Sequence, residues 1–173
     1  MSHVLITGGS GFLGSHICIS LLENNYKLVV LDNEANSTSK CLQRIKKFFE
    51  NKINSIEDKL IFINVDMRDF AELTKIFQNL EKRNIFIDSV IHLAGLKDMS
   101  KSFLKPLEYW DNNLVGSINL LKVMEKFSCR NIVFSSSASI YDSKINKKFT
   151  EDSKISPINP YGCLLYTSPS PRD

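Results

Sequence analysis

The sequence has 173 residues, of which 43% are apolar and 24% charged, and its formal net charge is +3. These values are typical of a globular domain and exclude collagen-like and disordered chains. The 22 basic and 19 acidic residues are mixed along the chain, which argues against a nucleic-acid partner. No apolar run approaches the roughly 20 residues of a membrane helix, and Met1 leads into a β-type segment rather than a signal-peptide core. We therefore expect a cytoplasmic protein without a membrane partner.

A chain of this length is one domain by size, yet it is short for an enzyme that needs both a cofactor-binding fold and a substrate lobe. Its four cysteines are Cys18, Cys41, Cys129 and Cys163. None of them forms a Cys-x-x-Cys pair, and no histidine stands at zinc-ligand spacing. We expect reduced thiols and no metal site.

Short β-branched runs alternate with helical segments along the chain. The expected strands are 4–7, 28–31, 60–65, 89–93 and 131–134. The expected helices run from Phe12 to about Asn24, and then over 41–49, 70–80 and 106–127. The first helix carries an apolar stripe of Phe12, Ile17, Ile19, Leu21 and Leu22. Such alternation implies right-handed crossovers, so the predicted fold is α/β, a doubly wound parallel sheet.

The periodicity ends at residue 135, and the polar segment 135–160 is rich in Ser, Asn, Lys and Pro. It follows the carboxyl end of the fifth expected strand. Because ligands bind at that edge of an open α/β sheet, we interpret the segment as an ordered functional loop.

Four of the seven glycines lie within residues 8–14, between the first strand and the first helix. The spacing G-x-G-x-x-G, which starts at Gly9, is informative in this strand–turn–helix context. Glycine lets the backbone approach a pyrophosphate, whose charge is met by free N–H groups at the helix start. We expect Phe12 and Leu13 to donate those groups to a dinucleotide.

Acidic residues follow two of the expected strands. Asp32 ends the second strand, where a carboxylate accepts hydrogen bonds from ribose hydroxyls and repels a 2′-phosphate, so NAD is favoured over NADP. Asp66 follows the third strand, and two roles are open to it: contact with the adenine amino group, or capping of the helix that begins at Phe70. Gly95, after the fourth strand, would let the cofactor lie close to the backbone.

Six segments share their sequence with a known family. They are 7–16 (TGGSGFLGSH), 31–33 (LDN) with Asn36 and Ser37, 90–97 (VIHLAGLK), 105–113 (KPLEYWDNN), 134–138 (FSSSA) and 160–162 (PYG). Over residues 2–162 the chain resembles the extended short-chain dehydrogenase/reductases, and among them the UDP-glucose 4-epimerase family. The segments AGLK and LEYxDNN are the more specific ones, because the glycine fingerprint is common to the whole superfamily.

The resemblance implies a Rossmann-type domain with NAD as cofactor. The residues it implies for contact with NAD are Gly8, Gly11, Phe12, Leu13, Gly14, Asp32, Asn33, Asn36, Ser37, Asp66, Met67, Leu93, Ala94, Gly95, Lys97, Asn112, Ser137 and Tyr161. It also implies a UDP-sugar substrate, a homodimeric parent enzyme, and interconversion of UDP-galactose and UDP-glucose through a 4-keto sugar. Tyr161 would remove the proton of the sugar 4-hydroxyl while hydride passes to the nicotinamide, and Ser137 would hold or relay that proton.

One residue departs from the family. The family has a lysine four residues after the tyrosine, and its charge lowers the pKa of the phenol. This chain has Leu165 at that position.

The similarity stops after Gly162, and the string 163–173 reads like the translation of a transposase sequencing adapter. Its prolines Pro169 and Pro171 and its lack of an apolar period predict that it does not continue the helix.

We therefore expect residues 1–162 to be an incomplete NAD-binding domain, truncated before its last elements. Residues 163–173 would be a non-native tail, and the substrate lobe would be absent. The chain is then an inactive fragment of a UDP-glucose 4-epimerase. Two alternatives stay open: another NAD-dependent sugar-nucleotide epimerase, acting on UDP-arabinose or UDP-glucuronate, and a non-catalytic NAD-binding module.

Overall fold

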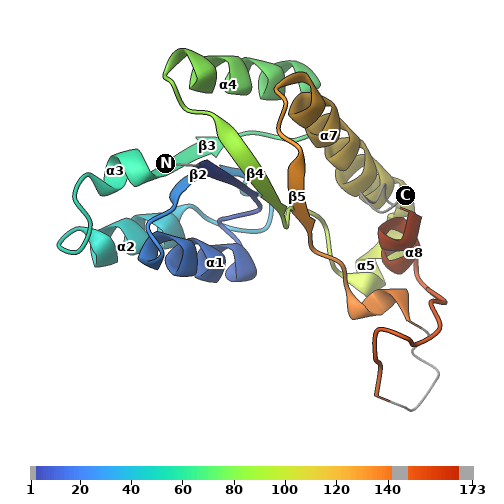
Figure 1. Ribbon diagram of the computed structural model, residues 1–173. Helices are drawn as coiled ribbons and strands as arrows, with labels where there is room; N and C mark the ends of the chain where they lie inside the picture. The colour runs from blue at the N-terminus through green and yellow to red at the C-terminus, as the bar shows by residue number, and fades with distance from the viewer. Residues whose placement is uncertain (1–2, 142–147, 168–173) are drawn as a thin grey trace.

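The computed structural model describes residues 3–141 and 148–167. Within these residues the chain forms one five-stranded sheet with the order β3-β2-β1-β4-β5 (Figure 1). The strands are β1 (His3–Thr7), β2 (Lys27–Asp32), β3 (Leu60–Asn64), β4 (Ile87–His92) and β5 (Asn131–Phe134). Every neighbouring pair is parallel, which confirms the predicted doubly wound α/β fold.

Helices cover both faces of the sheet. They are α1 (Phe12–Glu23) and α2 (Lys40–Phe49) on one face, and α4 (Phe70–Lys82) and α7 (Gly116–Lys126) on the other (Figure 1). Successive side chains of a strand point to opposite faces, so in β1 Leu5 packs toward α4 and α7 whereas Ile6 packs toward α1 and α2. Because both faces are buried, the central strands are continuous apolar runs, and this is why the sequence predicted them.

Several shorter helical elements were not predicted. They are α3 (Ile56–Lys59), α5 (Met99–Leu104), the 3-10 turn η2 (Ala138–Ile140) and the π-helix η1 (Trp110–Val115). The last lies between α6 (Pro106–Tyr109) and α7, so the expected helix 106–127 is helical from Pro106 to Lys126 and includes a π-helical segment in its first half. A π turn of this kind is common at functional sites.

The predicted apolar stripe of α1 is wrong at Phe12, whose side chain is 74% exposed. The rest of the stripe packs inward as predicted, because Leu22 is buried and Ile17, Ile19 and Leu21 pack against the core. Gly14 and Cys18 are buried as well. Phe12 lies at the start of the helix, in the wall of the cavity described below.

The prediction that residues after Gly162 leave the helix is also wrong. Helix α8 (Pro160–Thr167) continues five residues further, and the Leu164 side chain is only 1% exposed. The Asn159 side chain accepts a hydrogen bond from the Gly162 amide at 2.8 Å and so caps the helix, while proline is favourable at its first position. The part 168–173 of the predicted tail, with both of its prolines, lies outside the described residues.

None of the helices formed by the described residues is both long and apolar enough to cross a membrane.

Candidate functional site

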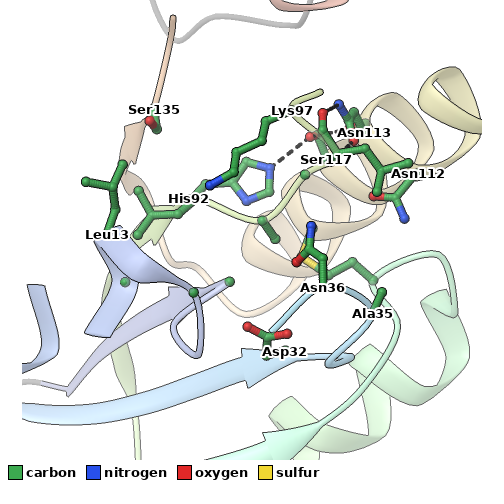
Figure 2. Close-up of a pocket in the computed structure, with 18 of the residues that line it drawn as sticks. Leu13, Asp32, Ala35, Asn36, His92, Lys97, Asn112, Asn113, Ser117 and Ser135 are labelled. Carbon is green, nitrogen blue, oxygen red and sulfur yellow. Dashed lines mark hydrogen bonds between the residues drawn. The ribbon is translucent and has the colours of Figure 1, made fainter. Parts of the chain in front are cut away.

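A cavity of about 580 Å³ lies at the carboxyl edge of the sheet. Its walls come from the glycine turn after β1, the segments after the other four strands, and η1 and α8 (Figure 2). The strand order reverses here, because β1 lies between β2 and β4, and ligands of doubly wound sheets bind at this switch point. All of the predicted cofactor-contact residues line this cavity except Ser37.

The glycine turn is packed so tightly that two of its glycines leave no room for a side chain. Gly8 has a φ of +69°, and a Cβ there would lie 2.8 Å from the amide nitrogen of Ala94. A Cβ on Gly14 would lie 2.5 Å from the carbonyl oxygen of Gly8. Gly11, the N-cap of α1, has no side chain with which to cap the helix, so the first amides of α1 are left for an external acceptor.

Asp32 is fixed in place by three hydrogen bonds. Its carboxylate accepts from the amide of Ser10 at 3.0 Å, the amide of Glu34 at 2.8 Å and the hydroxyl of Ser37 at 2.9 Å. Ser37 therefore orients Asp32 instead of lining the cavity. Figure 2 shows the carboxylate at the end of β2, directed into the cavity, with Lys97 and Asn112 on the opposite wall.

Asp66 lines the cavity after β3 and forms an ion pair with Arg68. The guanidinium contacts both carboxylate oxygens, with Nη2 2.7 Å from Oδ2 and Nε 3.0 Å from Oδ1. Its remaining nitrogen, Nη1, donates to Asp111 of η1 at 2.7 Å. Hydrogen bonds from Arg68 lower the pKa of Asp66 to about 2. The helix at Phe70 is capped by Asp69 rather than by Asp66, since the Asp69 side chain accepts from the amide of Glu72.

A buried chain of hydrogen bonds runs behind the cavity from β1 to η1. The Ser117 hydroxyl donates to the carbonyl of Asn113 at 2.6 Å, so its oxygen is left to accept from Nε2 of His92 at 2.9 Å (Figure 2). Nδ1 of His92 then accepts from the Thr7 hydroxyl at 2.6 Å. Each polar side chain in this series of hydrogen bonds has its partners when His92 is neutral. Burial lowers the pKa of His92 to about 4.

The same hydrogen-bond network holds the segment after β4 in place, and this segment forms one wall of the cavity. The Thr7 hydroxyl oxygen accepts from the amides of Leu93 and Ala94, each at 3.2 Å. The Asn113 side chain accepts from the amide of Leu96 at 2.8 Å and donates to its carbonyl at 2.9 Å. Asn113 lies next to Asn112 in the π-helix, and both residues line the cavity.

Tyr161 and Ser137, the two predicted catalytic residues, both line the cavity. Burial raises the pKa of Tyr161 above its ordinary value, and the neighbouring Ser137 side chain opposes the rise. The Ser137 hydroxyl itself donates to the Ser139 hydroxyl at 3.1 Å. The ring of Tyr109 contacts the Tyr161 ring edge to face, with centroids 6.4 Å apart. Leu165, one turn further along α8, also lines the cavity. The wall therefore has an apolar side chain one helical turn from Tyr161, where a cation would lower the pKa of the phenol.

Several residues that hold the site in place were not predicted from the sequence, among them Thr7, Asn113 and Ser117. His92 was noted only as part of a matching segment, although a histidine at the end of an apolar strand is a signal for a buried polar network. Arg68 was not predicted either, although a basic residue two positions after Asp66 is a candidate partner for its carboxylate. Among the described residues, no three His, Cys, Asp or Glu side chains are close enough to hold a metal ion.

Comparison with known proteins supports one family. Residues 5–164 match the family described as GDP-mannose 4,6 dehydratase. Over 159 residues the chain is 46% identical to UDP-glucose 4-epimerase 2 of Arabidopsis thaliana, and it is 38% identical to bifunctional UDP-glucose 4-epimerase and UDP-xylose 4-epimerase 1 of Pisum sativum. Each alignment covers 92% of this chain and 43% of the relative. The chain therefore spans less than half the length of these curated relatives.

The fold is shared with solved structures of the same enzymes. The crystal structure of UDP-glucose 4-epimerase from Bifidobacterium longum, in complex with NAD+ and UDP, superposes with a TM-score of 0.82 at 37% sequence identity. The match covers 95% of this chain and 46% of that chain.

Proposed function

The chain belongs to the GDP-mannose 4,6 dehydratase family of extended short-chain dehydrogenase/reductases, and we propose that it is the NAD-binding part of a UDP-glucose 4-epimerase. The parent enzyme would interconvert UDP-galactose and UDP-glucose through a 4-keto sugar. One observation carries the proposal: the glycine turn, Asp32, Ser137 and Tyr161 line a single cavity at the switch point of the sheet.

The residues present fit a bound dinucleotide. A side chain at Gly8 or Gly14 would collide with backbone atoms, so this tight turn can form only with glycine at these positions. Without side chains in the way, the turn can place its amides against a pyrophosphate, with Phe12 and Leu13 as donors. Asp32, held by Ser37, would accept from the adenosine ribose hydroxyls. NAD, when bound, supplies the hydride acceptor and donor that epimerisation requires.

Tyr161 would act as the base in this proposal. Tyr161 and Ser137 both line the cavity, so together they would receive and relay the proton of the sugar 4-hydroxyl. A phenol with a pKa of about 10 is protonated at neutral pH, and burial raises the pKa of Tyr161 further, so a positive charge nearby is needed to make it a base. Because Leu165 occupies the place where the family has lysine, we expect the chain as it stands not to convert UDP-galactose.

The test of the cofactor site is the preference of the chain for NAD over NADP. We expect NAD to bind at least tenfold more tightly, because the Asp32 carboxylate repels a 2′-phosphate. Asp32→Asn removes that charge and should bring the two dissociation constants within about threefold of each other. Asp58→Asn, on the exposed helix α3, is the matched control and should keep the wild-type ratio. Equal binding of both dinucleotides by the wild-type chain would contradict the assignment.

Replacing Leu165 with lysine is expected to lower the pKa of Tyr161 by one unit or more. The ammonium group would lie one helical turn from Tyr161 in the same wall, where an opposite charge within about 4–6 Å stabilises the phenolate. The pKa is measured by ultraviolet titration of the variant, and the titration of the same protein with Tyr161→Phe is subtracted from it. Leu165→Met, which keeps the apolar contact without the charge, is the control. An unchanged titration in Leu165→Lys would favour the non-catalytic NAD-binding module.

The sugar accepted by the parent enzyme is a further question. The Pisum sativum relative carries both UDP-glucose and UDP-xylose 4-epimerase in its name, so membership of the family does not by itself choose the sugar. Turnover of UDP-galactose by the complete gene product, against UDP-arabinose and UDP-glucuronate, would decide. For the homodimer expected of the parent enzyme, we propose that Leu104 and Leu107, whose side chains are exposed on α5 and α6, contribute to the interface.

A further inference from the structure

Helix α8 lies directly against the turn η2 at Gly162, the residue that follows Tyr161. A Cβ on Gly162 would lie 2.3 Å from the carbonyl oxygen of Ser139 and 3.1 Å from the Cβ of Pro157. The oxygen belongs to the backbone and cannot rotate away, so any side chain at this position must push α8 and η2 apart. Gly162 is helical, so glycine is needed here for space rather than for its backbone conformation.

The carbonyl that meets Gly162 belongs to the same turn as Ser137. The Ser137 hydroxyl oxygen accepts from the amide of Ser139 at 3.2 Å, and its hydrogen is donated to the Ser139 hydroxyl at 3.1 Å. The amide of Ser156 donates to the carbonyl of Ile140 at 2.9 Å, which ties the segment before α8 to the end of η2. The separation of α8 from η2 therefore sets where Ser137 lies relative to α8.

Helix α8 is also held by α5 and α6, and it lies beside α5 in Figure 1. The amide of Tyr161 donates to the hydroxyl oxygen of Ser102 at 3.4 Å, and the Tyr161 ring contacts that of Tyr109. Tyr109 is buried, and its hydroxyl donates to the carbonyl of Asp98 at 2.7 Å, so this ring is fixed in place. An added atom at Gly162 would have to displace α8 within this packing.

We propose that Gly162 is a positioning residue for the reaction: by letting α8 approach the Ser139 carbonyl, it holds the phenol of Tyr161 beside the hydroxyl of Ser137. The proposal rests on the roles proposed above for Tyr161 and Ser137. With a side chain at position 162 the two oxygens that would receive and relay the substrate proton would separate, and proton transfer depends steeply on such distances. The effect of the Ser137 side chain on the pKa of Tyr161 agrees with their proximity.

The experiment measures how strongly Ser137 acts on Tyr161 in the full chain. Tyr161 is replaced by a ring-fluorinated tyrosine, whose fluorine resonance follows the ionisation of that phenol alone and whose pKa is lowered into a less alkaline range. Ser137→Ala should raise the pKa of this phenol by about half a unit or more, as expected when a phenolate loses one hydrogen-bond donor. In Gly162→Ala the same Ser137→Ala change should produce less than about a third of that shift, because the two side chains no longer meet.

Three further variants make the loss specific to Gly162. Gly116→Ala adds the same methyl group to a buried helical glycine, in ordinary contact with Met67, and should keep the full effect of Ser137→Ala. Gly162→Ala combined with Tyr109→Leu gives α8 room to move, so it serves if Gly162→Ala alone does not fold, and it should also lose the effect. Tyr109→Leu alone should keep it. A merely structural role of Gly162 would lower the free energy of unfolding without changing the effect of Ser137 on the phenol.

The outcomes separate this inference from the proposed dinucleotide site. An effect of Ser137→Ala that persists in a folded variant carrying Gly162→Ala would overturn the role of Gly162, and so would its loss in Tyr109→Leu alone. Absence of the effect in the wild-type background would show that Ser137 and Tyr161 do not interact, and would overturn the inference as well. These titrations contain no ligand, so the preference for NAD over NADP tests the dinucleotide site independently.

Discussion

Replacing Gly14 with alanine is expected to lower the free energy of unfolding by about 3 kcal/mol. Helix propensity alone would favour alanine, but a Cβ at this position would lie 2.5 Å from both the carbonyl oxygen of Gly8 and the Cα of Gly9. Both are backbone atoms that cannot rotate away, so the turn itself must move. Urea denaturation monitored by circular dichroism measures the change, and binding of NAD should weaken in parallel.

Gly116→Ala is the matched control, because Gly116 is also helical and buried. Its Cβ would make ordinary contacts with Met67, 3.4 Å from the side chain and 4.0 Å from the backbone carbonyl carbon. In α7 the higher helix propensity of alanine is worth up to about 1 kcal/mol, so this variant should be neutral or slightly more stable than the wild type. Similar behaviour of the two variants would show that the crowding at Gly14 does not determine the stability of the turn.

Lowering the pH from 7 to 4 is expected to reduce the free energy of unfolding by about 3 kcal/mol through His92 alone. Burial lowers the pKa of His92 to about 4 in the folded chain, whereas an unfolded histidine titrates near 6.5. Between these values the unfolded state binds a proton that the folded state does not. This contribution to stability is therefore complete above pH 6.5, falls through the window from 6.5 to 4, and is constant below it.

Denaturation curves at intervals of half a pH unit, for the wild type and for His92→Gln, isolate this contribution. Glutamine keeps a donor and an acceptor for the Ser117 and Thr7 hydroxyls but does not titrate, so the variant should lose most of the slope between pH 6.5 and 4. The Asp66 ion pair acts below this window, because its folded pKa is about 2. An identical slope in both proteins would mean that His92 is not buried in its neutral form.

The sheet and its ligand edge could be predicted from the sequence because their signals are local. The runs of β1 and β2 are apolar without interruption, since both faces are covered, and the glycine turn stands directly between a strand and a helix. Asp32 was identified from its place at the end of a strand. These features depend on chain order and backbone sterics, both of which a single sequence records.

The rest could not be predicted because it depends on contacts between distant segments. Phe12 is exposed because it lies in the wall of a cavity that only the folded sheet forms, and α5 is a short segment of mixed polarity whose Ser102 is buried. Arg68 reaches Asp111 across 43 positions of sequence, and His92 reaches Ser117 across 25. The helical form of residues 163–167 follows from the Asn159 cap and the burial of Leu164, which the composition of the segment concealed.

The segment after β4 is ordered before any ligand arrives. Thr7 and Asn113 between them hold the amides of Leu93, Ala94 and Leu96, so this cavity wall has the backbone hydrogen-bonding of a strand although it is irregular. Ordering a free backbone costs roughly 1–2 kcal/mol of conformational entropy per residue, and here that loss is incurred during folding rather than during binding. A dinucleotide that enters the cavity would therefore keep more of its contact energy as affinity.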